Sequence, residues 1–168
     1  MTVSLHFDAD EAAISARRAA GLPLGNEPDL LEWTFFELPV HFVIGETDLT
    51  QGRRLPLLGV GPVGLFRLRQ AGEKGWSRIL LDGGYIDFEV AGDQVTVYSA
   101  GNRRTTNVPY RELLDVWGAF AEGVRRFLIE EFPELVSHHN WGEWFRTGDI
   151  PYLGPPPLRA PRKGSGGD

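Results

Sequence analysis

The chain has 168 residues with no cysteine, 42% apolar and 24% charged residues, and a formal net charge of −6. This length and composition are typical of one globular domain, and the lack of cysteine excludes disulfides, thiolate metal sites and cysteine nucleophiles. The acidic balance argues against nucleic-acid binding, which needs clustered cations for phosphate contacts.

The first twenty residues predict a short strand and a short helix. Three apolar residues alternate with polar ones in the strand: Val3, Leu5 and Phe7. Asp8 and Glu11 have the spacing of a capping box, and the Ala-rich stretch after them ends at Gly21, so a helix is predicted over 9–20. The N-terminus has no basic segment followed by an apolar one, and no apolar run approaches 18 residues. We therefore expect a cytoplasmic protein that makes no membrane contact.

The next part of the chain predicts a loop, a strand pair and a segment without a clear pattern. Residues 21–30 contain two Pro and two Gly and predict a loop. The stretch 31–44 is rich in aromatic and β-branched residues, and Pro39 marks a bend or a sheet edge within it. Alternation there places Phe42 on one face and His41 on the other. Residues 45–75 are rich in glycine and predict no distinct element.

A Gly-x-Gly-x-x-Gly pattern lies in this glycine-rich segment, at Gly59, Gly61 and Gly64, with Asp82 beyond it. A dinucleotide site needs such glycines between a strand and a helix of a βαβ unit, with an acid for the ribose. Here the helix is expected to end after barely two turns, and antiparallel strands follow. We therefore interpret the pattern as a Gly-rich loop and expect no cofactor.

The clearest pattern is an antiparallel meander of four strand-like runs joined by turn sequences, over 78–81, 85–90, 94–99 and 105–108. Apolar Ile86, Phe88 and Val90 should face one way and Tyr85, Asp87 and Glu89 the other. A long helix follows from Pro109 to Pro133. Its apolar residues recur at three- and four-residue steps and should cover the meander: Leu113, Val116, Trp117, Phe120, Val124, Phe127, Leu128 and Phe132.

These elements predict an α+β fold. An antiparallel sheet, made of the meander and the N-terminal strands, should pack against one long C-terminal helix and one short N-terminal helix. Residues 1–153 are expected to form a single domain. Residues 154–168 are rich in Pro and Gly and predict a flexible tail.

The four histidines do not predict a metal or catalytic site. His138 and His139 are adjacent, and Glu134 precedes them by one helical turn, but Pro133 interrupts the helix and no further ligand is placed by spacing. His6 and His41 lie on predicted strands with acids nearby, but no nucleophile or oxyanion donor accompanies them. We expect a structural role for both and no bound metal.

The order of elements resembles that of small bacterial immunity proteins of polymorphic toxin systems. The resemblance covers residues 78–135 and includes the helical sequence VPYRELLDVWGAFAEGVRRFLIEEFPEL. It implies a non-catalytic protein that inhibits a cognate toxin by covering the toxin's active site. Such families have no catalytic residues to transfer to this chain.

Three classes of function remain open. In the first, a protein partner binds the polar face of the meander and the C-terminal aromatic segment, through Asp87, Glu89, Thr96, Tyr98, Trp141 and Trp144. In the second, a small molecule or substrate occupies a pocket lined by N-terminal aromatic and polar residues: Trp33, Phe35, Glu37 and His41. In the third, the chain is a structural subunit of a larger assembly and exposes an apolar patch.

Overall fold

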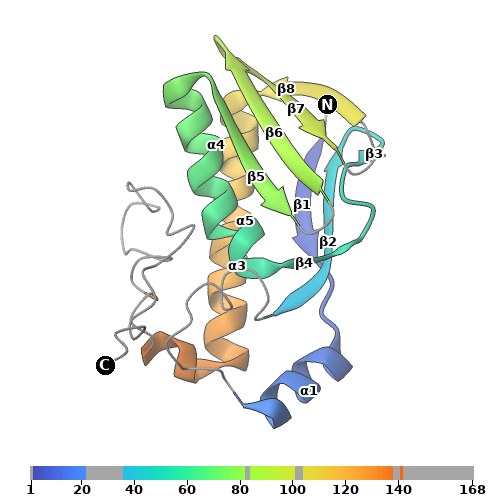
Figure 1. The fold of residues 1–168 in the computed structure, drawn as a ribbon, viewed down its shortest axis with the longest axis vertical. Coiled ribbons are helices and arrows are strands. Elements are labelled where there is room, and N and C mark those ends of the chain that lie inside the picture. The colour runs from blue at the N-terminus through green and yellow to red at the C-terminus, as the bar shows by residue number, and fades with distance from the viewer. Residues whose placement is uncertain (1, 22–35, 82–83, 101–103, 138–140, 142–168) are drawn as a thin grey trace, which may run out of the picture.

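The computed structural model describes residues 2–21, 36–81, 84–100, 104–137 and 141. Within these ranges the elements follow the order shown in Figure 1: β1 (Val3–Phe7), α1 (Glu11–Ala20), β2 (Glu37–Ile44), β3 (Thr47–Asp48), β4 (Arg54–Pro56), α3 (Leu57–Val60), α4 (Pro62–Lys74), β5 (Trp76–Leu81), β6 (Gly84–Ala91), β7 (Gln94–Ser99), β8 (Arg104–Pro109), α5 (Tyr110–Glu131) and the 3₁₀ helix η1 (Pro133–Ser137). The predicted α+β class is confirmed. None of the helices in these ranges is long and apolar enough to cross a membrane.

The strands form two separate four-stranded sheets, and every described strand pair is antiparallel. In the N-terminal sheet, β2 pairs with β1, β3 and β4. The second sheet is the predicted meander, with the strand order β5-β6-β7-β8. The prediction of one sheet is therefore refined, because the N-terminal strands pair with one another and not with the meander.

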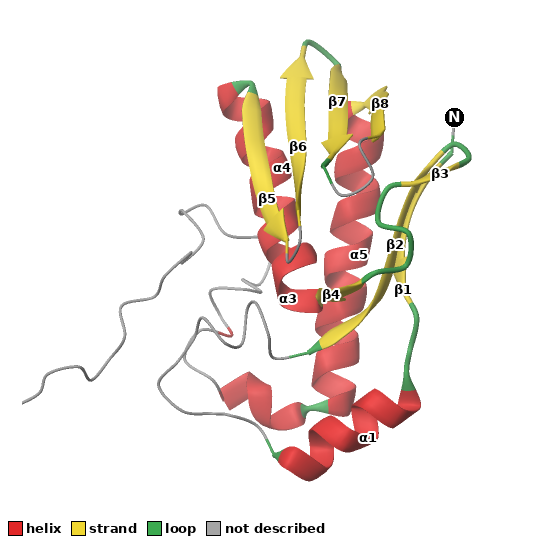
Figure 2. Ribbon diagram, turned by 45° about the vertical axis from the view of Figure 1, so that its right-hand side comes forward, coloured by secondary structure: helices red, strands yellow, loops and turns green. Residues whose placement is uncertain are grey.

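Helix α5 contacts both sheets, and α4 lies beside it against the meander (Figure 2). α4 packs against β5 and β6, while α5 packs against α4, β8 and β1. The predicted apolar stripe of α5 faces the interior, where Leu113, Trp117 and Val124 are fully buried. A single hydrophobic cluster includes buried residues from both sheets and from all three longer helices.

Trp117 of α5 lies at the centre of this cluster. Its ring meets Phe42 of β2 and Phe88 of β6 edge-on, with centroid distances of 5.1 and 5.3 Å. Its indole N–H donates a 2.8 Å hydrogen bond to the carbonyl of Val60, which satisfies the one polar atom of this buried side chain. One residue therefore joins both sheets to the helical layer.

The glycine-rich segment contains α3 and α4, which corrects the prediction of a Gly-rich loop. The pattern glycines allow close helix packing, because a Cβ on Gly64 would lie 2.8 Å from the Trp117 ring. Helix α4 runs through Gly72 to Lys74, so the predicted stop after two turns is wrong. Packing against α5 outweighs the low helix propensity of glycine.

The N-terminal helix α1 has a different N-cap from the predicted one, and its predicted C-terminal end is confirmed. It begins at Glu11, and its N-cap is Asp10, whose carboxylate accepts a 3.0 Å hydrogen bond from Ala13 N–H. Asp8 is left free for other contacts, and Gly21 is the C-cap as predicted. The proposed tail over 154–168 lies outside the part of the chain that the structure describes and stays a prediction.

Thr50 fills a gap in the N-terminal sheet. Its buried hydroxyl accepts a hydrogen bond from Phe42 N–H at 2.9 Å and donates one to the carbonyl of Val40 at 2.6 Å. These two groups of β2 lie between the stretches that pair with β3 and with β4. A side chain therefore satisfies the backbone groups that a continuous neighbouring strand would otherwise pair.

Candidate functional site

The outer face of the meander is the side turned away from α4 and α5 (Figure 2). Because strand residues alternate between the two faces, the register places one set of side chains there: Trp76, Arg78, Leu80, Tyr85, Asp87, Glu89, Gln94, Thr96, Tyr98, Thr105 and Asn107. None of them is buried. The opposite face is formed by core residues such as Ile79, Phe88 and Val97.

An arginine on β5, an edge strand of the meander, is fixed between an acid and aromatic rings. Arg78 donates to Asp87 through Nε at 2.6 Å and Nη2 at 2.8 Å. Its guanidinium carbon lies 3.7 Å from the centroid of the Tyr85 ring and 5.5 Å from that of Trp76. Tyr98 on β7 extends the row, with its ring 6.1 Å from that of Tyr85. Such a stack gives the planar guanidinium a defined orientation.

Two large apolar side chains of β5 flank this arginine. Trp76 is 51% exposed and Leu80 is 55% exposed. Solvent exposure of a tryptophan and a leucine four residues apart on one strand is unfavourable in an isolated protein. Their location beside Arg78 and Tyr85 gives this face the residue types that dominate protein interfaces.

The four meander residues of the predicted partner site lie on this one face, at paired positions. Asp87 is opposite Tyr98, and Glu89 is opposite Thr96. The bidentate contact with Arg78 neutralises the charge of Asp87. Glu89 is the exposed acid of the pair.

The predicted aromatic extension is described only in part. Trp141 is half-buried and packs against the hydrophobic core cluster. Trp144 lies outside the described residues, as do Trp33 and Phe35 of the alternative ligand pocket. Their predicted roles stay predictions.

A polar cluster lies on the outside of the N-terminal sheet, around His41. His6 of β1 is directly opposite His41 of β2, and their rings stack with centroids 5.0 Å apart. His41 Nδ1 donates to Asp48 Oδ2 at 2.8 Å, and His41 Nε2 lies 3.1 Å from Asp8 Oδ2. Ligand atoms of His6, Asp8 and His41 all lie within 4.8 Å of one another.

The turn after β3 holds the Asp48 carboxylate in place. Its Oδ1 atom accepts hydrogen bonds from the backbone N–H groups of Thr50 and Gln51, at 3.0 and 2.8 Å. Gly52 brings the turn against the imidazole, because a Cβ there would lie 2.7 Å from Cε1 of His41. The ring of His41 is therefore oriented from one side by Asp48 and confined from another by Gly52.

The carboxylates also affect the protonation of His41. The hydrogen bond to Asp48 raises the pKa of His41 above its ordinary value, against the opposing effect of burial, and Asp8 adds to the increase. Burial alone would raise the pKa of Asp48, but hydrogen bonds from His41, Gln51 and Thr50 together lower it.

Two members of the alternative ligand pocket, Glu37 and His41, lie within the described residues, both on β2. His41 and Glu37 lie on the solvent side of β2, whereas Phe36 and Phe42 are buried in the core. The alternation of β2 therefore places Glu37 and His41 on the face opposite to Phe42, and their predicted role together with Trp33 and Phe35 stays a prediction.

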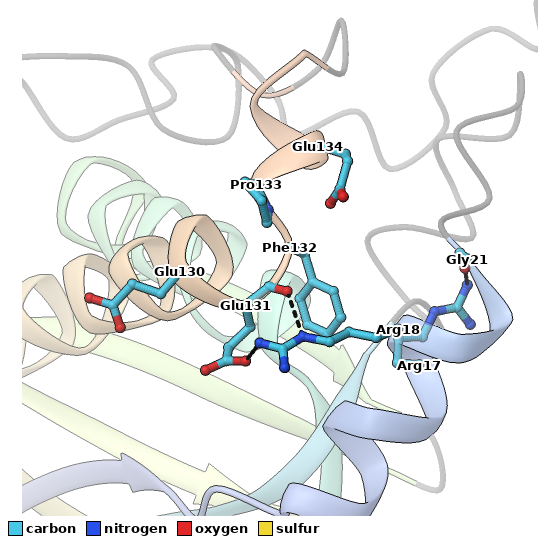
Figure 3. Close-up of a pocket in the computed structure, with 8 residues that line it drawn as sticks. All are labelled: Arg17, Arg18, Gly21, Glu130, Glu131, Phe132, Pro133 and Glu134. Atoms are coloured by element: carbon cyan, nitrogen blue, oxygen red, sulfur yellow. Dashed lines mark hydrogen bonds and ion pairs between the residues drawn. The ribbon is translucent and has the colours of Figure 1, made fainter.

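A different cavity, of about 470 Å³, lies between α1 and the end of α5 (Figure 3). Both of its arginines are engaged: Arg18 contacts the carboxylate and the backbone carbonyl of Glu131, and Arg17 donates to the carbonyl of Gly21. Three glutamates also line it. This arrangement holds α1 against α5.

Comparison with known proteins assigns neither a family nor a function to this chain. No family model, no characterised protein and no solved structure matches this chain. The chemistry of the two outer faces is therefore the basis for assigning function.

Sequence reasoning missed Trp76, Arg78 and Leu80 as members of the meander site. The alternation that assigned Tyr85 and Asp87 to the outer face also applies to β5 and would have found them. The grouping of His6 and Asp8 with His41 had no comparable signal, since it depends on the pairing of β1 with β2.

Proposed function

We propose that the protein is a non-catalytic, cytoplasmic protein-binding module that docks a basic protein domain on the outer face of the meander. The observation that carries this proposal is the exposure of Trp76 and Leu80 beside the fixed Arg78. A docked partner would remove both apolar side chains from water without rearranging the sheet. Tryptophan, tyrosine and arginine are the residues most enriched among interface hot spots.

Charge favours a basic partner over a second copy of the same chain. Each chain carries a formal net charge of −6, so two copies repel one another at long range. Glu89 is an exposed acid on the face itself and offers a contact to a cation of the partner. The sequence resemblance to immunity proteins supplies the class of partner, a cognate bacterial toxin.

The proposal is tested by measuring binding of the purified product of the adjacent gene to the wild-type protein and to Trp76→Ala/Leu80→Ala. Each of these side chains contributes about 1.5–3 kcal/mol when it is fully buried. We expect the double variant to lose affinity by a factor of about 100 or more, because two anchors are removed. Calorimetry or surface plasmon resonance would give the two dissociation constants.

Val136→Ala is the matched control, because Val136 is also a large apolar residue, 47% exposed, but lies on η1. It should bind like the wild type. Equal affinity of the wild type and the Trp76/Leu80 variant would exclude the outer face of the meander as the interface.

A single charge reversal, Glu89→Lys, tests the charge argument separately. It should slow association several-fold at low salt and have less effect at high salt, because steering by charge is screened. Asp87 is not suitable for this test, since Asp87→Lys would also break the ion pair with Arg78.

A further inference from the structure

Three side chains on the outside of the N-terminal sheet present ligand atoms of the kinds that bind transition metals. His6 and Asp8 are in and just after β1, and His41 is their cross-strand neighbour on β2. Their ligand atoms lie within 4.8 Å of one another. His6 and Asp8 are both exposed, so small side-chain rotations can bring them closer together.

The closest pair already has the separation of two ligands on one metal ion. His41 Nε2 and Asp8 Oδ2 are 3.1 Å apart. Two ligand atoms of a tetrahedral Zn²⁺ ion lie about 3.3 Å apart, because each is about 2.0–2.1 Å from the metal. A metal ion can therefore be placed between these atoms with little movement of the backbone.

The other nitrogen of His41 has the partner that histidine ligands commonly use. Nδ1 lies 2.8 Å from Asp48 Oδ2, and when the one proton of the neutral ring is on Nδ1, Nε2 keeps a lone pair on the side of Asp8 Oδ2, 3.1 Å away. Such a carboxylate–histidine pair orients a metal-bound imidazole and increases its basicity. Asp48 is itself held by two backbone N–H groups, so this second partner is fixed before any metal binds.

We propose that His6 and His41, through one imidazole nitrogen each, and Asp8, through its carboxylate, form a three-ligand site for a divalent transition metal ion such as Zn²⁺. Two imidazoles and one carboxylate form a donor set that zinc accepts, and they leave a fourth position open to solvent. Asp48 is a positioning residue that acts through His41. The site lies on the N-terminal sheet and is separate from the proposed docking face.

The test uses the full chain without a polyhistidine tag, stripped of metal with a chelator and titrated with Co²⁺ and with Zn²⁺. The wild type should bind one equivalent, and the Co²⁺ complex should show the visible absorption of a four-coordinate site. His6→Ala and Asp8→Asn, both at exposed positions, should lower the affinity at least tenfold. Asp48→Asn should lower it by about 10–100-fold.

His138→Ala/His139→Ala is the matched control, because it removes the other two histidines of the chain. It should bind metal like the wild type. An NMR spectrum of the imidazole nitrogens should show the Nε2 signal of His41 shifting with Zn²⁺ while Nδ1 keeps its proton. Absence of saturable binding, loss of binding in the control, or full binding by His6→Ala would overturn the proposal.

Discussion

The N-terminal sheet and the meander differ in the sequence separation between their paired strands. In the N-terminal sheet, Val3 pairs with Ile44, so a helix and a long segment separate the two strands in sequence. In the meander, each strand pairs only with its neighbour in the chain. The meander thus displays side chains from consecutive hairpins, whereas the His41 cluster exists only after distant strands have paired.

The two sheets also expose different chemistry. The outer face of the meander carries exposed aromatic and apolar residues around one ion pair, which suits a macromolecular partner. The outer face of the N-terminal sheet carries histidines and carboxylates with fixed hydrogen bonds, which suits a small cation. Four sets of variants test how the two sheets and the helices are stabilised.

Trp117→Ala should have the largest effect, because it removes the ring that both sheets contact. We expect a loss of about 3–5 kcal/mol in the free energy of unfolding. Hydrogen exchange should accelerate equally in peptides from β1–β2 and from β6–β7, and urea unfolding should remain a single transition. Trp76→Ala, at an exposed position, should cost less than about 0.5 kcal/mol. Unchanged protection of the meander in Trp117→Ala would show that the sheets are stabilised independently.

Gly52→Ala and Gly92→Ala form a matched pair across the two sheets. Both glycines have φ near +64°, at +64° for Gly52 and +63° for Gly92, so each substitution should cost about 1–2 kcal/mol from the backbone alone. Gly92 has open space around it, whereas a Cβ on Gly52 would collide with His41. We therefore expect Gly52→Ala to lower the free energy of unfolding by about 1 kcal/mol more than Gly92→Ala does. Thermal unfolding would measure the difference, and equal costs would show that His41 moves without resistance.

Thr50→Val tests the gap in the N-terminal sheet. It leaves the buried N–H of Phe42 and the carbonyl of Val40 without their hydroxyl partner, and it should cost about 1–3 kcal/mol. Thr96→Val, on the outer face of the meander, keeps its strand hydrogen bonds and should stay within about 0.5 kcal/mol of the wild type. Similar losses at the two positions, measured by urea unfolding, would contradict the bridging role of Thr50.

The smallest effect should come from Glu122→Gln on α5. Hydrogen bonds from Arg125, and then Arg126, lower the pKa of Glu122 from 4.5 to about 2 against the opposing effect of burial. Because the folded-state pKa is depressed, this carboxylate stabilises the fold above pH 4.5, and the contribution is lost as the pH falls toward 2. The pair is partly exposed and screened by solvent, so the gain is at most about 1 kcal/mol.

The measurement is the melting temperature of the wild type and of Glu122→Gln from pH 7 to pH 2. Their difference should be largest near neutral pH and should shrink below pH 4.5. Glu130→Gln, on an exposed position of the same helix, serves as the control. A difference that is constant over this range would exclude the ion pairs of Glu122 as its cause.

Local patterns were sufficient to predict the meander and α5. Alternation with adjacent turn sequences determines β6 and β7, and a 3.6-residue period determines the buried face of α5. The same local information placed Asp87, Glu89, Thr96 and Tyr98 on one face. The prediction did not reveal that Arg78 neutralises Asp87, because that contact depends on the register of β5 against β6, which places Arg78 opposite Asp87.

Long-range information was needed for the remaining features. Helix α4 was missed because its glycines lower helix propensity, and their compensation is the packing of Gly64 on Trp117. The His41 cluster was missed because the sequence does not show that His6 and His41 are partners. Both features depend on contacts between segments that are distant in the chain.

The position of Trp117 has a consequence for how such a sequence can diverge. Any change in the size of this side chain alters the space available to Phe42, Phe88 and Gly64 at once. These four positions should therefore covary among relatives, a larger residue at 64 accompanying a smaller one at 117. The outer faces of both sheets are free of that constraint, so partner specificity can evolve there while the interior stays fixed.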